Sequence, residues 1–290
     1  MNFTSEDIKE LREKSGAGMM DCKKALSETN GNIEKAIEWL RKTGIDTAQK
    51  KSSRVASDGL ITVKISESAG IILEINAETD FVARNENFQK FCDDISNTCI
   101  QKNIDNLETL MNTNFLNTEK KVKDQLTETI SVLGENLVIK KLKFIKQSNC
   151  FLQKYLHNSI NDNSGKIGVL LVFTSKKINN EVDEVSKNLC MHIAAMDPKS
   201  INIEDLKEEL VEKEKSIFTE QLKSSGKPDN IIKKIVDGKL NKYYEDVCLL
   251  EQFFVMDNKL KIKDYLNLFN NEKNLEFKIV NFFMFKLGQE

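Results

Sequence analysis

The chain predicts an α+β protein with an N-terminal three-helix bundle, a core of two sheet-plus-helix modules, and a protruding antiparallel helical hairpin. Three observations support this class. The hydrophobic period changes from 3.6 residues in the N-terminal region to two in the segment that follows. A strand-then-helix pattern begins again at Cys150, which suggests an internally duplicated core. A highly charged segment with a narrow apolar stripe interrupts the second copy.

These patterns divide the chain into five regions. They are a three-helix docking domain of the ubiquitin-associated type (1–45), a linker (46–57), a first α+β module (58–147), a second α+β module (148–197 and 246–290) and a helical hairpin (198–245). Small helical bundles often serve as docking modules, and a narrow stripe on a hairpin is typical of an interaction arm.

Local signals define the helices of the N-terminal region. Thr4 and Asp7 form a capping-box pattern, and the glycines after Ser15 break the first helix. Asn32 is placed to cap a third helix, for which Gly44 provides a C-terminal stop. The polar residues of the linker lack periodicity, so we expect a solvated tether there.

The first module begins with two alternating strands. Ile61–Ile65 and Ile71–Ala77 alternate apolar with polar residues, and a five-residue loop (66–70) joins them into a hairpin. Helical patterns follow at 87–103 and 118–133. The stretch Leu137–Lys146 predicts a strand with one wet face.

The second module and the hairpin follow the same logic. Gly168–Phe173 predicts a buried strand and Glu181–Ala195 a helix, while the last strand has its apolar face at Phe277, Ile279, Phe283, Phe285 and Leu287. The hairpin stripe comprises Ile203, Leu206, Leu210 and Ile217 on one helix, and Ile231, Ile232, Ile235, Val236 and Leu240 on the other. The glycine and proline of Ser224–Pro228 separate the two helices.

Composition excludes several classes of function. The 43 Lys and Arg against 45 Asp and Glu leave a net charge of −2, which argues against a nucleic-acid partner. No apolar run approaches the length of a spanning helix, so we expect no membrane association. The first residues have neither a basic cap nor an apolar core, which predicts a cytoplasmic protein.

No residue pattern proposes catalysis or a cofactor. The chain has six scattered cysteines and only two histidines, His157 and His192, and it lacks a phosphate-binding glycine loop. Cys190 and His192 are spaced like half of a metal site, but no second ligand pair follows, so a structural role is favoured. We therefore expect no cofactor and no catalytic groups.

Two segments are unusual for plain packing. Met19 and Met20 begin a helix about 100° apart, so either one of them is exposed for a partner or both seal the bundle. Asp80 and Phe81 lie between a strand and a helix. Phe81 is either a wedge assisted by Asp80 or an inward-packed staple for the next helix.

Both segments resemble a known family. The runs ELREKSGAGMMDCKKAL at Glu10–Leu26 and TDFVARN at Thr79–Asn85 are similar to the two signatures of bacterial elongation factor Ts. DGLITVKI, GIILEINAETDF, MHIAA and SGKP agree as well, and the resemblance covers nearly the whole chain. Arg84 stands where the family often has lysine, which keeps the charge.

The resemblance implies a guanine-nucleotide exchange factor for elongation factor Tu, without catalytic groups of its own. Leu11, Met19 and Met20 would dock on the partner's GTPase domain. Thr79, Asp80, Phe81 and Val82 would insert near the partner's Mg²⁺ site and promote GDP release. The region around His157 would touch another domain of the partner. The hairpin resembles the family's dimerisation arm, although its stripe can serve a homodimer, another partner or neither.

Three alternatives remain open from the residues alone. The chain can be a non-catalytic adaptor that bridges protein partners through the bundle and hairpin. It can be a thiol- or metal-dependent enzyme, against which the missing His and Cys clusters speak. It can bind RNA through the patch of Lys50, Lys51 and Arg54, which would give a steep salt dependence.

Overall fold

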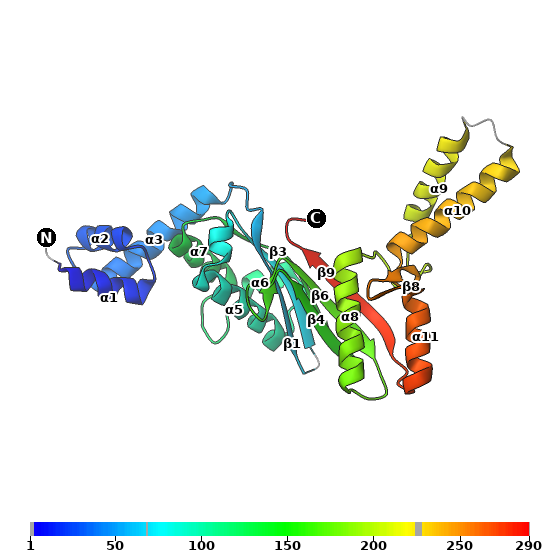
Figure 1. The fold of residues 1–290 in the computed structure, drawn as a ribbon. Coiled ribbons are helices and arrows are strands. Elements are labelled where there is room, and N and C mark those ends of the chain that lie inside the picture. Colours follow the sequence, from blue (N-terminus) through cyan, green and yellow to red (C-terminus); the bar gives the residue numbers. More distant parts are fainter. Residues whose placement is uncertain (1–2, 68, 224–227, 290) are drawn as a thin grey trace. The chain divides into compact units, whose positions relative to one another are not determined.

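The computed structural model describes residues 3–67, 69–223 and 228–289 (Figure 1). Two compact units divide the chain. The first is drawn from residues 1–146, 156–168 and 285–290, and the second from residues 147–155 and 169–284. Helices and antiparallel strands occur in separate runs, which confirms the predicted α+β class.

The first three helices surround a small core of their own. They are α1 (Ser5–Ser15), α2 (Met19–Glu28) and α3 (Ile33–Lys51), and the buried residues between them are Leu11, Cys22, Ala25, Leu26 and Ala36. The predicted capping box is present: Thr4 and Asp7 accept each other's backbone N–H. Gly16 ends α1 in the left-handed conformation, and Asn32 caps α3 through a bond to the Lys35 N–H.

The predicted end of the third helix at Gly44 is wrong, because α3 continues to Lys51 through half of the expected linker. Gly44 has a different use. A Cβ at this position would come within 2.8 Å of the Ser131 Oγ on α7 (Val122–Leu133). The glycine therefore permits close approach of α3 to α7, a contact that no local signal in the sequence reveals.

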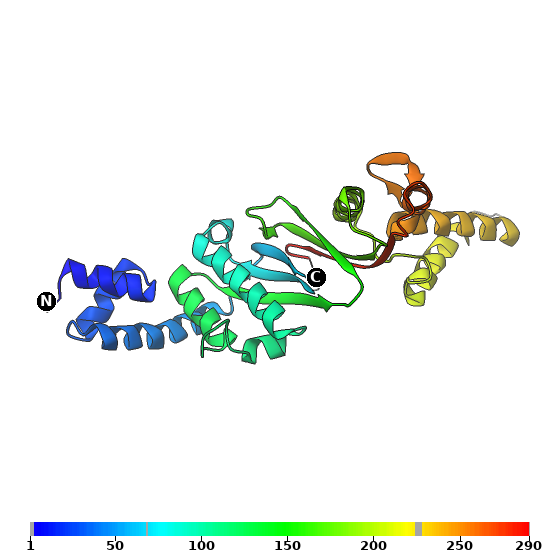
Figure 2. The same ribbon diagram turned by 90° about the horizontal axis from the view of Figure 1, so that it is seen from below.

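Four strands form the sheet of the first unit, in the order β3-β2-β1-β5. They are β1 (Asp58–Ser66), β2 (Ala69–Ala77), β3 (Leu137–Lys146) and β5 (Ser164–Gly165). The bounds of β3 are those predicted. Ser66 pairs with Ala69, so the hairpin strands extend into the predicted five-residue loop. Helices α5 (Glu86–Lys102), α6 (Leu107–Asn112) and α7 share one apolar core with this sheet (Figure 2).

Strand β2 is buried at all nine positions, including Glu74 and Asn76, the polar residues of its alternating pattern. The carboxylate of Glu74 lies 3.2 Å from the Lys141 Nζ and accepts the Gly288 N–H at 3.1 Å. Gly168, from a later strand that belongs to the other sheet, packs against this face: a Cβ added to it would lie 2.6 Å from methyl groups of Ile61 and Val63. Segments from later in the chain therefore cover the face that carries the polar residues of β2.

The second unit contains most of a three-stranded sheet, in the order β4-β6-β9. Its strands are β4 (Phe151–His157), β6 (Ile167–Thr174) and β9 (Lys278–Lys286), and its core includes α8 (Asn180–Met196) and α11 (Ile262–Lys273). The predicted strand at 168–173 and helix at 181–195 are confirmed. The predicted face of the last strand is confirmed for Phe277 and Ile279 but wrong beyond them, because Phe282 and Met284 pack on this core in place of Phe283 and Phe285. The change of face falls at Asn281, whose side chain accepts the Phe282 N–H.

Helices α9 (Glu208–Lys223) and α10 (Asp229–Val247) pack against each other, and a two-stranded ribbon of β7 (Phe253–Phe254) and β8 (Asp257–Lys261) follows. The stripe between the helices consists of Ile232, Val236 and Leu240 with Val211, Phe218 and Leu222. Leu210, Ile217 and Ile231 were predicted in it but are exposed, and residue 203 precedes the helix. The predicted stop at 224–227 lies outside the described residues.

Two glycines give a matched test of this packing. Gly168→Ala should lower the free energy of unfolding by about 1–3 kcal/mol, because its methyl group has no room beside Ile61 and Val63. Gly238→Ala places a methyl group in open space on the helix α10 and should raise stability by up to about 1 kcal/mol. Thermal and denaturant unfolding of both variants would check the opposite signs. Equal effects of the two substitutions would contradict the crowding at Gly168.

Candidate functional site

The segment predicted as a loop around Phe81 is one turn of helix, α4 (Asp80–Ala83). Thr79 precedes it in an extended conformation. The side chains of Val82 and Ala83 point into the core of the first unit, whereas that of Phe81 is 80% exposed. The alternative in which Phe81 packs inward is therefore wrong. Val82 anchors the turn in the core, and the side chain of Phe81 is exposed to solvent.

Asp80 lies beside Phe81 on the outer side of the same turn. Its Oδ2 is 3.6 Å from the Arg84 Nε; the Arg84 side chain is largely exposed and that of Asp80 is half-exposed. An exposed ion pair of this length contributes little to stability. The Asp80 carboxylate thus remains accessible to a positive group from outside the chain.

Thr79 is fixed by a residue that the sequence did not single out. Glu135 accepts the Thr79 N–H at 3.0 Å and the Thr79 hydroxyl at 2.6 Å. The hydroxyl makes no capping bond to α4. The separation of 56 positions between the partners and the ordinary turn composition around Glu135 leave no sequence signal for this contact.

The predicted docking residues differ in exposure. Met19 and Met20 at the start of α2 are 51% and 74% exposed, so the alternative in which both seal the bundle is wrong. Leu11 is fully buried among the three helices. Its side chain is not presented to a partner, and its role in this structure is to hold the helices together.

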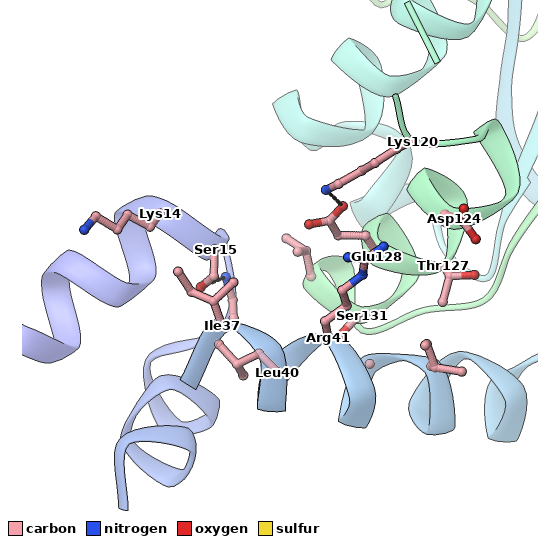
Figure 3. A pocket seen from close by; sticks show the side chains of 14 residues that line it. Lys14, Ser15, Ile37, Leu40, Arg41, Lys120, Asp124, Thr127, Glu128 and Ser131 are labelled. Carbon is pink, nitrogen blue, oxygen red and sulfur yellow. Dashed lines mark hydrogen bonds and ion pairs between the residues drawn. The ribbon is translucent and has the colours of Figure 1, made fainter. Parts of the chain in front are cut away.

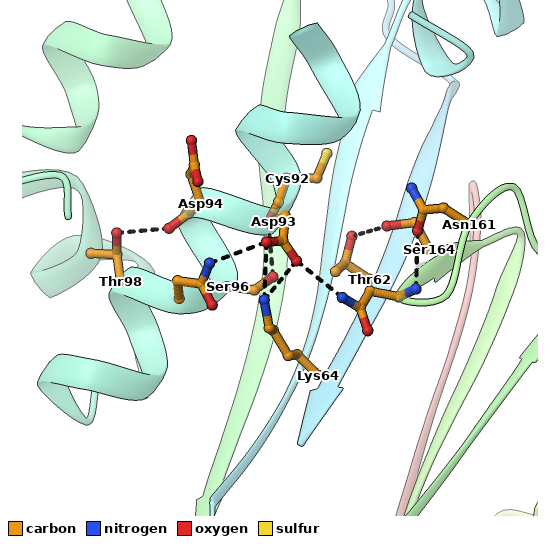
Figure 4. A network of polar contacts seen from close by, with 11 residues as sticks. Thr62, Lys64, Cys92, Asp93, Asp94, Ser96, Thr98, Asn161 and Ser164 are labelled. Carbon is orange, nitrogen blue, oxygen red and sulfur yellow. Dashed lines mark hydrogen bonds and ion pairs between the residues drawn. The ribbon is translucent and has the colours of Figure 1, made fainter. Parts of the chain in front are cut away.

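His157 is exposed at the end of β4. The loop that follows it takes part in a network of polar contacts, in which Figure 4 labels Asn161 and Ser164. The carboxylate of Asp93 on α5 accepts from the Lys64 Nζ at 2.8 Å and from the Asn163 Nδ2 at 3.1 Å. The hydroxyls of Thr62 and Ser164 meet at 2.9 Å in a buried pair. The loop after His157 is therefore tied to β1 and to α5.

The side chain of Gln89 links the two predicted contact regions of the first unit. Its Nε2 donates to the Arg84 carbonyl at the end of α4 (3.0 Å), and its Oε1 accepts from the Asn161 Nδ2 (2.8 Å). The side-chain amide of Gln89 thus bonds both to the turn bearing Phe81 and to the loop after His157. Met19 and Met20 lie on a separate element, α2.

The histidine and thiols considered for metal or redox chemistry are embedded in packing. His192 is buried, its Nε2 lies 2.9 Å from the Gln252 Oε1, and its Nδ1 accepts the Val255 N–H. Burial raises the pKa of the Cys99 thiol to about 12 and also raises that of Cys190. These thiols are protonated and poorly nucleophilic at neutral pH. Across residues 3–67, 69–223 and 228–289, no cluster of three or more His, Cys, Asp or Glu could hold a metal ion.

A cavity of about 420 Å³ lies between α1, α3 and α7 (Figure 3). Ile37, Leu40 and Val132 give it apolar walls, and Lys120 and Glu128 form an ion pair of 2.6 Å at its edge. The predicted site residues do not line it. Two of the three basic residues suggested for RNA have protein partners: Lys51 donates to the Gly134 carbonyl, and Arg54 lies 3.6 Å from Glu78. Within the described part of the chain, no helix combines the length and apolarity of a membrane span.

Comparison with known proteins matches residues 78–289 to the family described as "Elongation factor TS". This range contains α4, Glu135 and the polar loop after His157. This family match places the chain among the translation elongation factors.

Relatives extend the match to the full chain. Proteins named elongation factor Ts from Magnetococcus marinus and from Rickettsia bellii are each 41% identical over 100% of this chain, covering 94% and 93% of their own lengths. The chain belongs to the elongation factor Ts family.

The buried His192 predicts a pH-dependent stability. Burial lowers its pKa below the ordinary value of 6.5, so the unfolded chain binds a proton at this residue more readily than the folded chain. The stabilising effect is complete above pH 6.5 and declines as the pH falls from 6.5 towards the folded-state pKa. We expect unfolding free energies measured between pH 7.5 and 5 to decrease less steeply for His192→Gln than for the wild type.

The matched control is His157→Gln, which replaces the exposed histidine and leaves the contribution of His192 in place. If the free energy of unfolding of His192→Gln falls as steeply with decreasing pH as that of the wild type, another group causes the acid sensitivity.

Proposed function

We propose that this chain is a guanine-nucleotide exchange factor that binds elongation factor Tu in its GDP-bound state and promotes GDP release. The observation that carries the proposal is Phe81, a large aromatic side chain held in water on a turn whose neighbours Val82 and Ala83 are buried. Membership of the elongation factor Ts family supports the choice of partner. GTP would then enter the emptied site of the partner.

In the proposed mechanism, Thr79–Val82 enters the partner near its Mg²⁺ site. That ion neutralises the phosphates of the bound nucleotide, so its displacement weakens the hold on GDP. Phe81 acts as the wedge, and the accessible Asp80 carboxylate competes for positive groups around the phosphates. Val82 and Ala83 brace the turn against the core. The mechanism needs no acid, base or cofactor of this chain.

Energetics indicate how much of the acceleration Phe81 can supply. Each tenfold gain in the release rate requires about 1.4 kcal/mol of barrier lowering. Full burial of a Phe side chain provides about 1.5–3 kcal/mol, which corresponds to about one or two powers of ten. Greater acceleration must come from further contacts that improve as the nucleotide leaves. By reciprocity, GDP weakens the binding of this chain as much as the chain weakens GDP.

Further contacts are assigned to the other exposed residues. Met19 and Met20 offer flexible thioether side chains to the partner's GTPase domain, which suits an apolar groove. His157 and its tied loop provide a second contact with the partner. Leu210, Ile217 and Ile231 leave apolar surface on α9 and α10, which supports an arm for homodimer formation. A cytoplasmic location, without nucleic acid or membrane, completes the proposal.

A non-catalytic adaptor is the second candidate. The observation in its favour is that α2 and the α9–α10 hairpin expose apolar residues on elements separate from α4. Such a protein would bridge partners without changing nucleotide release. The two candidates therefore differ in their dependence on Phe81.

The test follows release of a fluorescent GDP from the cognate elongation factor Tu by stopped flow. We expect the wild type to accelerate release by orders of magnitude, and Phe81→Ala to lose at least tenfold of that acceleration because the wedge is removed. Since Phe81 is exposed, its removal should change the free energy of unfolding by less than about 0.5 kcal/mol.

Val55→Ala is the matched control, because Val55 is exposed to 82% and lies outside the proposed contact. It should retain the wild-type rate. Failure of the wild-type chain to accelerate release would favour the adaptor. Full activity of Phe81→Ala would show that another part of the chain accelerates GDP release, and Met19 and Met20 would be the next residues to test.

A further inference from the structure

A short segment between α7 and β3 contacts the base of the Phe81 turn. It consists of Gly134, Glu135 and Asn136, and we refer to it as the 134–136 clasp. Gly134 ends α7 in the left-handed conformation, with φ of +76°. This conformation favours glycine, and it turns the chain so that the next two residues face the start of α4.

Glu135 holds Thr79 at two points. One carboxylate oxygen accepts the Thr79 N–H at 3.0 Å, and the other accepts the Thr79 Oγ1 hydroxyl at 2.6 Å. Hydrogen bonds to an ionised carboxylate are shorter and about twice as strong as bonds between neutral groups. Two bonds to one residue fix its backbone and its side-chain rotamer together. Thr79 is the residue directly before Asp80 and Phe81.

Asn136 makes the complementary contact from the other direction. Its backbone N–H donates to the Glu78 carboxylate at 2.7 Å, and its buried side-chain amide donates to the Arg54 carbonyl at 2.8 Å. The other Glu78 oxygen lies 3.6 Å from the Arg54 guanidinium. The acidic residues Glu78 and Glu135 thus lie on two facing segments, and each accepts from the opposite one.

The clasp also contacts the end of α3. The Lys51 Nζ in the last turn of that helix donates to the Gly134 carbonyl. The clasp is therefore the common partner of three segments: the end of α3, the polar stretch at Arg54, and the base of the Phe81 turn. Because Thr79 caps α4 by its backbone alone, the direction of the turn depends on this outside support.

We propose that Glu135 is a positioning residue, which acts through Thr79 to hold Phe81 in the orientation needed for insertion. The inference rests on the proposed exchange function. Because the turn is already fixed in the free protein, binding to the partner does not carry the entropy cost of ordering it. Loss of the clasp would leave Val82 anchored and Phe81 exposed but would widen the range of directions in which Phe81 points. Docking through other surfaces would persist, while the productive step would become rare.

The first test uses the free protein and needs no partner. Amide hydrogen exchange of the segment 78–84 should be at least tenfold faster in Glu135→Ala than in the wild type, because the Thr79 N–H loses its acceptor. Glu135→Gln retains one acceptor oxygen and should be intermediate. Glu128→Gln breaks an ion pair of 2.6 Å on α7 and is the matched control, with wild-type exchange in this segment.

The second test separates docking from release. In stopped-flow titrations against elongation factor Tu loaded with fluorescent GDP, Glu135→Ala should lower the maximal release rate at least tenfold, while the half-saturating concentration changes less than threefold. Thr79→Val removes the hydroxyl that donates to Glu135 and should lower the maximal rate of GDP release as well. Thr79→Ser restores the hydroxyl and should recover the wild-type rate, which a general loss of packing would not allow.

The outcomes distinguish the inference from the function on which it rests. If amide hydrogen exchange of the segment 78–84 is the same in Glu135→Ala as in the wild type, the role of Glu135 is overturned. The same follows if the wild-type chain accelerates GDP release and Glu135→Ala reaches the same maximal rate. An inactive wild-type chain would overturn the exchange function, and hydrogen exchange would still test the clasp. If Glu135→Ala does not fold, Glu135→Gln and the Thr79 pair carry the same comparison.

Discussion

The buried carboxylate of Glu74 is the interaction on which the first unit depends. An ionised group without partners inside a protein costs several kcal/mol, so the unit must bring compensating groups to it. Lys141 from β3 and the Gly288 N–H from the end of the chain supply them. This requirement joins β2 to β3 and to the segment at Gly288. β2 is buried up to Ala77, and the first exposed residue after it is Phe81.

Features of the fold that depend on neighbours in sequence could be predicted from it. The capping box at Thr4, the cap at Asn32 and the bounds of β3 each follow from a few adjacent residues. The errors arise where a distant segment decides. Gly44 looks like a helix stop until Ser131 is seen against it, and Glu74 looks like a surface residue until Gly288 covers it.

The same distinction applies to the candidate site. An aromatic residue beside an aspartate between two elements left Phe81 with two alternatives, and the exposure of its side chain in the folded chain excludes the inward-packed one. The polar residues that hold the turn had no such signal. Glu135 and Gln89 have partners 56 and 72 residues away, and a carboxylate in a turn or an amide on a helix can bond to almost any polar group. Only the folded backbone selects which donor it meets.

The uninterrupted course of α3 has a consequence for the proposed binding of the partner at two places. The helix is about 28 Å long at about 1.5 Å per residue: residues 33–40 pack among the N-terminal helices, and the rest continues as a rod to Lys51, which bonds to the 134–136 clasp. With a flexible linker, the second binding element would sample many positions after the first had bound, and its effective concentration at the partner would depend on linker length. A rigid helix holds the second element in one position and so avoids the entropy cost of fixing it. In return it admits only those partner conformations whose two contact points match its length.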